Sequence, residues 1–306
     1  MKKIAVVIVT FNSAKHIGRL LDKLLSQSYP VAQIIIVDNK SDDKTCDIVH
    51  GYQNNNFGIK IHLHQLGANL GGAGGFAKGF EIAKDSGCDY IVSLDDDAYP
   101  ASDTFIADMV AAKNQYDYDA ISALVVDSDN HELAAYEYQV NGNRHTRIID
   151  IQKVPFLDND IKLFNGALFD KKVVERVGIP RAEFFIRGDE QEYKMRILSA
   201  GFKTAVFTRV IVYHSTSVSE YFYIQGKRYH HLDSPFKLFY SVRNQAYILR
   251  LRNDINMFKK SKIAYKYFWQ YTWFYLVYKK NTRSYWLWLK AFIYGLIGYM
   301  KNDFKG

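Results

Sequence analysis

The first hundred residues alternate between short apolar segments and segments with helical periodicity. Four apolar segments rich in Val and Ile predict β-strands at Ile4–Thr10, Ile34–Val37, Ile61–His64 and Tyr90–Leu94. Apolar residues recur at helical spacing between them, in Ser13–Ser26, Thr45–Gly51 and Gly75–Ser86. An alternating order of strands and helices indicates parallel strands in one sheet, joined by right-handed helical crossovers. We therefore expect an α/β, Rossmann-like fold with a mostly parallel sheet and flanking helices.

Polar residues stand where these expected strands end. Thr10 closes the first strand, Asp38 follows the second, Asn69 follows the third, and Asp95–Asp97 follow the fourth. Ligands of open parallel sheets bind outside the carboxyl ends of the strands. The sequence therefore predicts a binding site at this edge.

Three adjacent carboxylates, Asp95, Asp96 and Asp97, indicate a metal site. Neighbouring carboxylates repel one another unless a cation compensates them, and hard oxygen ligands favour Mg²⁺ or Mn²⁺. A solvated acidic turn is the alternative. His214 ends another expected strand, Ala205–Tyr213, and a neutral imidazole there can complete a Mn²⁺ site. A hydrogen-bonded histidine at a strand end is its alternative.

A second acidic cluster opens an expected helix at Asp189–Glu192. Asp189 or Glu190 is a candidate general base for an acceptor hydroxyl. Acidic residues in a first helical turn are also favoured by the helix dipole alone.

A glycine-rich segment, Asn69–Gly75, precedes the helix at Gly75–Ser86. Glycines allow close approach of a ligand, and a helix N-terminus favours anions; a tight strand-to-helix turn is the alternative. The segment has neither the dinucleotide fingerprint nor the ending of an ATP-binding P-loop. The 2 cysteines, Cys46 and Cys88, allow neither a disulfide framework nor a CxxC zinc site.

The C-terminal part of the chain differs in composition from the rest. Residues 219–306 carry 16 basic and 4 acidic residues, all 4 Trp and 13 of the 23 Tyr, whereas residues 1–218 carry 24 basic and 28 acidic residues. We expect two parts, 1–218 and 219–306, the second built mainly of helices at Pro235–Arg252 and Ser261–Tyr299. Trp and Tyr beside Lys and Arg favour an interfacial helix on an anionic membrane surface. Nucleic-acid binding, a hairpin packed on the core and a subunit interface in an oligomer are the alternatives.

The N-terminal apolar segment is short and lacks a following cleavage site, so we expect a strand rather than a signal peptide. We expect a cytoplasmic protein that associates peripherally with the inner face of the cell membrane.

Together, several motifs resemble one enzyme family. They are IVTFN at 8–12, VDNKSDD at 37–43, NLGGAGGFAKG at 69–79, LDDDAYP at 94–100 and FIRGDEQEYKMR at 185–196, followed by His214. In this order they resemble inverting, nucleotide-sugar-dependent glycosyltransferases of family 2, which have the GT-A fold, and in particular the galactofuranosyltransferase branch. The resemblance covers residues 3–215.

The resemblance implies roles for individual residues. Thr10, Asp38 and Asn39 would hold uridine, while Asn12, Asn69 and Gly72 would also contact the donor. Asp95 and Asp97 would contact ribose, metal and diphosphate, with Asp96 closer to the sugar and His214 as the third protein ligand of Mn²⁺ or Mg²⁺. Glu190 or Asp189 would be the base.

The function that this resemblance implies is transfer of galactofuranose from UDP-galactofuranose to a hydroxyl of a lipid-linked cell-surface glycan. Rhamnose from dTDP-rhamnose, or another UDP-sugar, is the nearest alternative. A nucleotidyltransferase should carry a glycine-rich basic loop after the first strand, where this chain has TFNSAKH. A non-catalytic protein that binds membrane or nucleic acid is the remaining alternative, although we expect no nucleic-acid partner.

Overall fold

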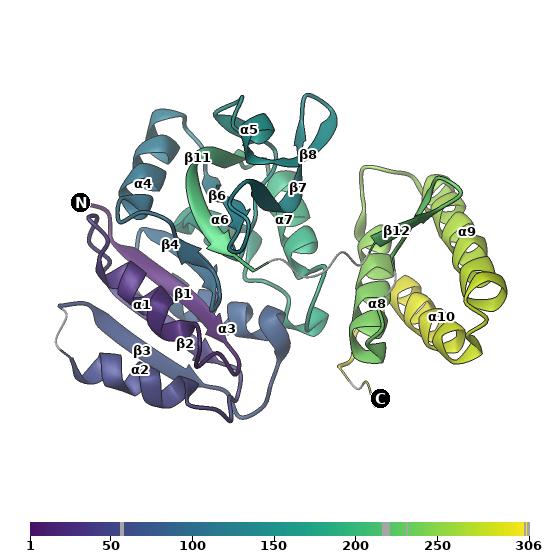
Figure 1. The fold of residues 1–306 in the computed structure, drawn as a ribbon, viewed down its shortest axis with the longest axis horizontal. Helices are drawn as coiled ribbons and strands as arrows, with labels where there is room; N and C mark the ends of the chain where they lie inside the picture. Colours follow the sequence, from purple (N-terminus) through teal and green to yellow (C-terminus); the bar gives the residue numbers. More distant parts are fainter. Residues whose placement is uncertain (56–57, 216–220, 231, 303, 305–306) are drawn as a thin grey trace. The chain divides into compact units, whose positions relative to one another are not determined.

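The chain folds into two compact units. The computed structural model describes residues 1–306 except 56–57, 216–220, 231, 303 and 305–306. The first unit comprises Met1–Ala182 and Tyr193–Thr216, and the second comprises Glu183–Glu192 and Ser217–Gly306 (Figure 1). The second unit therefore includes ten residues from the middle of the chain, which a single boundary at residue 218 would assign to the first.

The first unit alternates strands and helices along its N-terminal half. Its strands are β1 (Ile4–Thr10), β2 (Gln33–Asp38), β3 (Lys60–Gln65), β4 (Tyr90–Asp95), β5 (Tyr99–Pro100), β6 (Ala120–Asp127), β7 (Leu133–Val140), β8 (Asn143–Arg147), β9 (Phe156–Asp158), β10 (Asn165–Asp170) and β11 (Thr204–His214). Its helices are α1 (Ile17–Leu25), α2 (Thr45–Asn54), α3 (Gly71–Asp85), α4 (Phe105–Gln115), α5 (Ile148–Ile151), α6 (Lys171–Val177), the start of the 3₁₀ turn η1 (Ala182–Phe184) and most of α7 (Asp189–Ser199).

One sheet organises the first unit, with the strand order β3-β2-β1-β4-β10-β6-β11-β5. β1 pairs in parallel with β2 and β4, and β6 pairs in parallel with β11. β10 is antiparallel to both β4 and β6. The expected α/β fold with a mostly parallel sheet is confirmed, and the antiparallel strand in its middle is a feature that the sequence did not indicate.

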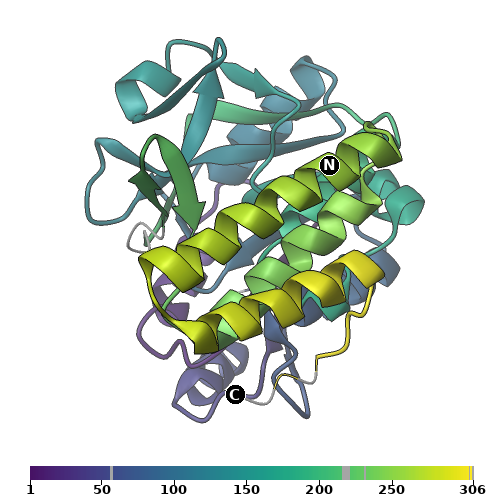
Figure 2. The same cartoon turned by 90° about the vertical axis from the view of Figure 1, so that its right-hand side faces the viewer.

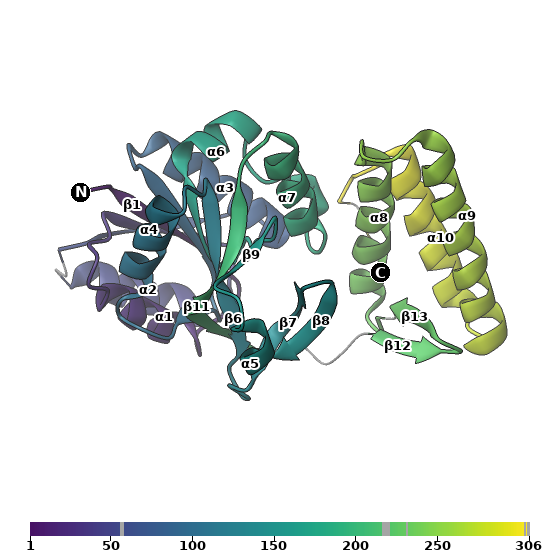
Figure 3. The same cartoon turned by 90° about the horizontal axis from the view of Figure 1, so that it is seen from above.

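Helices cover both faces of this sheet. On one face α1, α2 and α4 share a core with the even-numbered residues of β1, such as Val6 and Ile8. On the other face α3 packs directly on β1, and α6 and α7 belong to the same core as Val7 and Val9 (Figure 3). β1 is buried along its whole length, which explains its continuous apolar sequence.

The glycines after residue 70 lie within α3 rather than in a loop before it. A Cβ atom on Gly75 would lie 2.4 Å from Cγ1 of Val9, and one on Gly79 would lie 2.3 Å from Cγ1 of Val7. These two glycines therefore let α3 approach β1 more closely than any larger residue would. By contrast, a Cβ on Gly72 would meet nothing within 4 Å.

The second unit consists of a hairpin and helices. Its elements are β12 (Tyr221–Ile224), β13 (Lys227–His230), α8 (Pro235–Leu251), α9 (Met257–Trp273), the π-helix η2 (Phe274–Tyr278) and α10 (Thr282–Ile297). The helices run alongside one another (Figure 2), and α8 packs directly on α10. A Cβ on Gly295 of α10 would lie 2.1 Å from the carbonyl oxygen of Arg243 on α8.

Stacked aromatic rings fill the core of the second unit. Trp288 is buried between Tyr271, Tyr285 and Phe292. Among the residues that the structure describes, no helix has the length and apolarity needed to cross a bilayer.

Candidate active site

The register of the sheet brings the strand-end residues to one edge. Thr10 is paired with Asp38 across β1 and β2, and Val9 is paired with Asp95 across β1 and β4. The backbone N–H of Asn39 donates to the carbonyl oxygen of Thr10 at 2.8 Å. Thr10, Asp38 and Asn39 are all buried. The expected assembly of polar residues at the carboxyl ends of these strands is therefore present.

A hydrogen-bond network orients the Asp38 carboxylate. The Ser41 hydroxyl donates to Oδ1 of Asp38, and the Ser41 N–H donates to Oδ2 at 3.0 Å. Asn12 has a left-handed backbone with φ 52°, and its N–H donates to the Ser41 hydroxyl at 2.9 Å. Its Oδ1 accepts from the N–H of Asp42 at 2.9 Å. Asn12 thus joins the loop after β1 to the loop after β2.

Asn39 and Asn69 form the turn into α3. The amide of Asn39 donates to the carbonyl oxygen of Gly71 at 3.1 Å and accepts from the N–H of Leu70 at 3.2 Å. Oδ1 of Asn69 accepts from the N–H of Gly71 at 2.8 Å. These contacts give both asparagines a structural part in the turn. Their predicted contact with the donor, like that of Gly72, stays a prediction.

The Asp96 carboxylate faces the loop after β1. Its Oδ2 accepts from the N–H of Phe11 at 3.0 Å. Burial raises the pKa of Asp96 above its ordinary value, and the hydrogen bond from Phe11 opposes that shift only in part.

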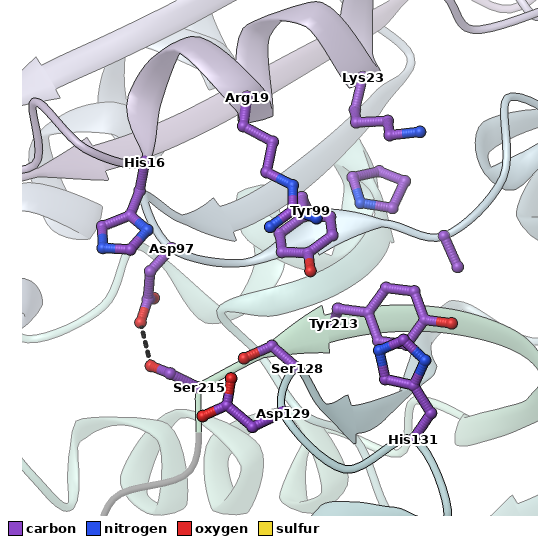
Figure 4. A pocket seen from close by; sticks show the side chains of 12 residues that line it. His16, Arg19, Lys23, Asp97, Tyr99, Ser128, Asp129, His131, Tyr213 and Ser215 are labelled. Carbon is purple, nitrogen blue, oxygen red and sulfur yellow. Dashed lines mark hydrogen bonds between the residues drawn. The ribbon is translucent and has the colours of Figure 1, made fainter.

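Asp97 and His214 contact each other directly. Nε2 of His214 lies 3.3 Å from Oδ1 of Asp97, and the Ser215 hydroxyl donates to Oδ2 of Asp97 at 2.6 Å (Figure 4). Burial raises the pKa of Asp97, but the partners His214 and Ser215 outweigh burial and hold the pKa below its ordinary value. The structure thus brings together a carboxylate and an imidazole that are 117 positions apart in the sequence.

This pair fits part of a divalent-metal site. Ligand atoms about 2.0–2.2 Å from one cation lie roughly 3 Å apart, which matches the separation of the two side chains. Nδ1 of His214 is buried and has no hydrogen-bond partner among the residues described. Across those residues, however, no three His, Cys, Asp or Glu side chains are grouped so as to hold a metal ion. The structure places Asp97 and His214 next to each other, and the roles of Asp95, Asp97 and His214 as metal ligands stay predictions.

The acidic pair Asp189–Glu190 begins α7 and belongs to the second unit. Asp189 is 7% exposed, whereas Glu190 is half-buried. Burial, together with the charges of Glu190 and Glu192, raises the pKa of Asp189 to about 7. A carboxyl that titrates near neutral pH is suited to general-base catalysis.

The segment before this pair has an unusual backbone. Phe185 and Arg187 both have φ 64°, in the left-handed region, and Gly188 has φ 86°. Residues other than glycine adopt this region at a cost of about 1–2 kcal/mol each. The conformation of this segment therefore needs support from elsewhere in the unit.

Two buried residues of α8 supply that support. Nδ2 of Asn244 lies within hydrogen-bond distance of the carbonyl oxygens of Phe184, Ile186 and Arg187, at 2.8, 2.9 and 2.7 Å. The Arg243 guanidinium donates to the carbonyl oxygen of Glu183 at 2.7 Å and, through Nε, to Oδ1 of Asn244 at 2.9 Å. Arg243 and Asn244 are both 0% exposed. We call these two residues the α8 clamp.

No role was predicted from the sequence for the α8 clamp or for Ser215. The signal for the clamp was present, because an Arg-Asn pair interrupts an otherwise largely apolar and aromatic helical segment at 238–249. Buried polar residues in such a segment indicate that their side chains make specific hydrogen bonds. Ser215 gave no signal beyond its position after His214.

Comparison with known proteins decides the family. Residues 5–178, more than half of the chain, match the family model described as glycosyl transferase family 2. The chain belongs to glycosyl transferase family 2. The resemblance expected from the sequence motifs is therefore confirmed.

Two relatives of the chain are named as galactofuranosyltransferases. The chain is 29% identical to galactofuranosyltransferase GlfT1 of Mycolicibacterium smegmatis over 80% of this chain and 82% of that protein. It is 28% identical to GlfT1 of Mycobacterium tuberculosis (strain H37Rv) over 93% of this chain and 92% of that protein. A third relative, dTDP-rhamnosyl transferase RfbF of Shigella flexneri, is 25% identical over 81% of this chain and 80% of that protein.

Solved structures share the GT-A fold. The crystal structure of S. aureus TarS 1-349 matches with a TM-score of 0.59 at 19% identity, covering 96% of this chain and 81% of that one. Mannosyltransferase PcManGT from Pyrobaculum calidifontis, in complex with GDP-Man and Mn²⁺, matches with a TM-score of 0.57 at 15% identity, covering 96% and 74%. At these identities the likeness establishes the fold.

Proposed function

We propose that this family 2 glycosyltransferase transfers galactofuranose from UDP-galactofuranose to a hydroxyl of a lipid-linked surface glycan, with inversion at the anomeric carbon. The observation that carries the donor assignment is the similarity to two GlfT1 proteins over at least four-fifths of each chain. The motif NLGGAGGFAKG at 69–79 and the three consecutive aspartates support it.

Nucleotide binding is proposed at the carboxyl ends of β1 and β2. The Asp38 carboxylate, oriented by Ser41, would accept hydrogen bonds from the uracil edge. Thr10 and Asn39 would complete the uridine site, with Asn12, Asn69 and Gly72 along the donor. Asp95 and Asp96 would face the ribose and the transferred sugar.

Asp97 and His214, with Asp95, would hold a divalent cation, Mn²⁺ or Mg²⁺. When bound, such a cation offsets the negative charge that develops on the departing diphosphate. Ser215 orients the Asp97 carboxylate through its hydroxyl.

The transfer itself is a single displacement. The acceptor oxygen forms a bond to the anomeric carbon as the bond from that carbon to the diphosphate oxygen breaks, and UDP leaves. Asp189 or Glu190 accepts the acceptor's proton. Because attack and departure occur on opposite faces, the anomeric configuration inverts.

A donor panel tests the sugar assignment. The protein is incubated with UDP-galactofuranose, UDP-galactopyranose, UDP-GlcNAc or dTDP-rhamnose, each with Mn²⁺, with Mg²⁺ or with chelator, and released nucleotide is measured with galactose-terminated acceptors. We expect release from UDP-galactofuranose, lost with chelator and in His214→Ala. Exposed His50→Ala on α2 is the matched control. Preference for another donor would overturn the galactofuranose assignment and leave the fold and family intact.

Rhamnose is the second candidate sugar, because the Shigella relative named for dTDP-rhamnose matches about four-fifths of both chains. Thymine differs from uracil by one methyl group, so the two donors compete for the same Asp38 site. A ratio of kcat/KM for UDP-galactofuranose over dTDP-rhamnose below one would favour this candidate.

Two substitutions separate the candidate bases. If Asp189 is the base, kcat should rise with pH through about 7, because its pKa is raised to about 7 and only the ionised form accepts a proton. Asp189→Asn should then abolish transfer, whereas Glu190→Gln should retain transfer and move the rise in kcat to lower pH, because the charge of Glu190 helps to raise the pKa of Asp189. The opposite pattern would assign the base to Glu190.

We also propose peripheral association with the inner face of an anionic membrane. α9 has no buried residue and no acidic residue. Residues three or four positions apart form one exposed aromatic and basic face of this helix, which we call the α9 stripe: Phe258, Lys262, Tyr265, Lys266, Trp269 and Trp273. Trp and Tyr favour the interfacial region, and each Lys near an anionic surface contributes about 1 kcal/mol.

Vesicle sedimentation tests this surface. We expect binding to phosphatidylglycerol-containing vesicles, weak binding to phosphatidylcholine alone, and roughly fivefold weaker binding for Lys266→Ser, the equivalent of about 1 kcal/mol. Lys60→Ser, an exposed lysine on β3, should bind like the unchanged protein. Equal binding by all three proteins would exclude the α9 stripe as the docking surface.

A further inference from the structure

A pocket in the first unit is lined by Asp97 and Ser215 and otherwise by residues outside the proposed donor and metal site. It has a volume of about 400 Å³. One wall comes from α1 and the residue before it, and carries His16, Arg19 and Lys23 (Figure 4). The opposite wall comes from the segment between β6 and β7, with Ser128 and His131 among its residues.

The α1 wall is basic and its cations are not neutralised. His16, Arg19 and Lys23 are three and four positions apart, so they lie on one face of the helix. In the part of the chain that the structure describes, neither Arg19 nor Lys23 makes an ion pair with a carboxylate. The opposite face of α1 is buried in the core through Ile17 and Leu21. The helix therefore presents two available positive charges to the pocket.

Arg19 is held in place by an aromatic ring. Its guanidinium carbon lies 3.8 Å from the centroid of the Tyr99 ring, a close cation–π contact. This contact distinguishes Arg19 from a surface arginine whose guanidinium contacts only water. The contact reduces the entropy that Arg19 would lose when it binds a ligand, because fewer side-chain conformations remain to be restricted.

The rest of the pocket suits a sugar ring. The His131 and Tyr213 rings stack with centroids 4.2 Å apart, and Tyr99 lies 5.6 Å from Tyr213. Ser128 and the exposed carboxylate of Asp129 stand on the same wall and can accept hydrogen bonds from sugar hydroxyls. The Asp97 carboxylate also lines the pocket, and it already has His214 and Ser215 as partners.

We propose that this pocket binds a phosphorylated sugar unit of the acceptor, with the phosphate on Arg19 and Lys23 and the sugar ring beside Tyr213 and His131. The planar guanidinium group of arginine and the ammonium group of lysine both form charge-assisted hydrogen bonds with phosphate oxygens. The position of the pocket beside Asp97 puts such a unit next to the proposed metal ligands. The proposal rests on the proposed glycosyl transfer, and adds that the acceptor carries phosphate.

Binding is tested by calorimetry with galactose 1-phosphate as the probe and saturating UDP present, so that the donor site is already filled. Galactose and inorganic phosphate are the comparison ligands. We expect galactose 1-phosphate to bind more tightly than either. Arg19→Gln and Lys23→Gln should each weaken it at least tenfold and leave the affinity for UDP unchanged. Lys15→Gln changes an exposed lysine just before α1 that does not line the pocket, and should have no effect.

The outcomes distinguish the two proposals. Failure of UDP itself to bind would contradict the proposed function. UDP binding without galactose 1-phosphate binding, or binding that neither pocket variant weakens, would overturn the pocket assignment alone. Equal affinity for inorganic phosphate would overturn the sugar-binding part. Circular dichroism checks folding, and Lys23→Gln keeps the test valid should Arg19→Gln disturb Tyr99, because the Lys23 side chain makes no hydrogen bond among the described residues.

Discussion

The α8 clamp makes a specific prediction about catalysis. Asn244→Ala removes the amide that holds the carbonyl oxygens of Phe184, Ile186 and Arg187, just before the acidic pair. We expect the substitution to lower kcat at least a hundredfold while the KM for the donor changes little. The reason is that Asn244 acts as a positioning residue: it touches the backbone that leads into α7, and the proposed donor residues lie in the first unit.

The magnitude follows from the hydrogen bonds. The Asn244 amide has two protons, and losing them removes hydrogen bonds from the part-buried carbonyls of Ile186 and Arg187, at about 1–2 kcal/mol each, or roughly 2–4 kcal/mol together. The left-handed backbones of Phe185 and Arg187 store about 2–4 kcal/mol. The free energy contributed by the Asn244 hydrogen bonds is thus similar to the free energy stored in the backbone. Loss of these hydrogen bonds should therefore let the segment relax. A displacement of about 1 Å in a catalytic group lowers rates about a hundredfold.

The assay compares variants of matched stability. Phe274→Ala removes a fully buried ring in the core of the second unit and should lower the free energy of unfolding by about 3–5 kcal/mol, without touching residues 183–188. Asn244→Asp keeps the shape of the side chain but has no amide protons, so it should be as impaired as Asn244→Ala. Each variant is measured for unfolding in urea, for kcat and for donor KM.

Two results would refute the reasoning. One is a loss of kcat in Asn244→Ala no greater than in Phe274→Ala at equal folded fraction, since the effect would then be general destabilisation. The other is recovery of activity in Asn244→Asp, which would show that shape rather than hydrogen-bond donation matters.

The remaining predictions concern pH, packing and the metal ligands. Because the pKa of Asp189 is raised to about 7 in the folded chain and is about 3.9 when unfolded, the folded state holds a proton between these values. The protein's free energy of unfolding should therefore fall by up to about 4 kcal/mol as pH rises from 4 to 7. Urea titrations across that range should show this dependence on pH in the unchanged protein and not in Asp189→Asn. Gly79→Ala should destabilise the protein by about 1–3 kcal/mol through the clash with Val7, whereas Gly72→Ala should be neutral or stabilising; thermal melts that rank the two equally would contradict the packing argument. Asp97→Asn should weaken Mn²⁺ binding measured by electron paramagnetic resonance at least tenfold, and unchanged binding would remove Asp97 from the metal site.

The parallel half of the fold was predictable because its signals are local. β1 is continuously apolar, and Asp38 and Asp95 end their strands where the sequence predicted. The antiparallel strand β10 was not predictable, since strand direction within a sheet is set by contacts far apart in sequence. The glycines of α3 were interpreted as a loop before the helix, and in the structure they allow close packing on β1. Spacing alone does not distinguish these uses of glycine.

The candidate site likewise combines features that local motifs predict with features that depend on packing. The motifs indicated Asp97 and His214 as candidates, but only the fold shows that they touch. The buried state of Asp189 and the partners of Arg243 depend on packing that no single motif encodes. The C-terminal hairpin of β12 and β13 was likewise not expected, and α9 and α10 are separate helices where one long helical region from Ser261 to Tyr299 was predicted.

The grouping of Glu183–Glu192 with the C-terminal residues has a consequence for how relatives of this enzyme can be recombined. A chimera joined near residue 218 would pair the acidic segment of one parent with the clamp of the other. Such a joint should yield soluble but inactive hybrids wherever the two parents differ at the clamp. Moving 183–192 together with α8 would transfer the acidic pair and its support as one inherited module, so these two segments should vary together among relatives.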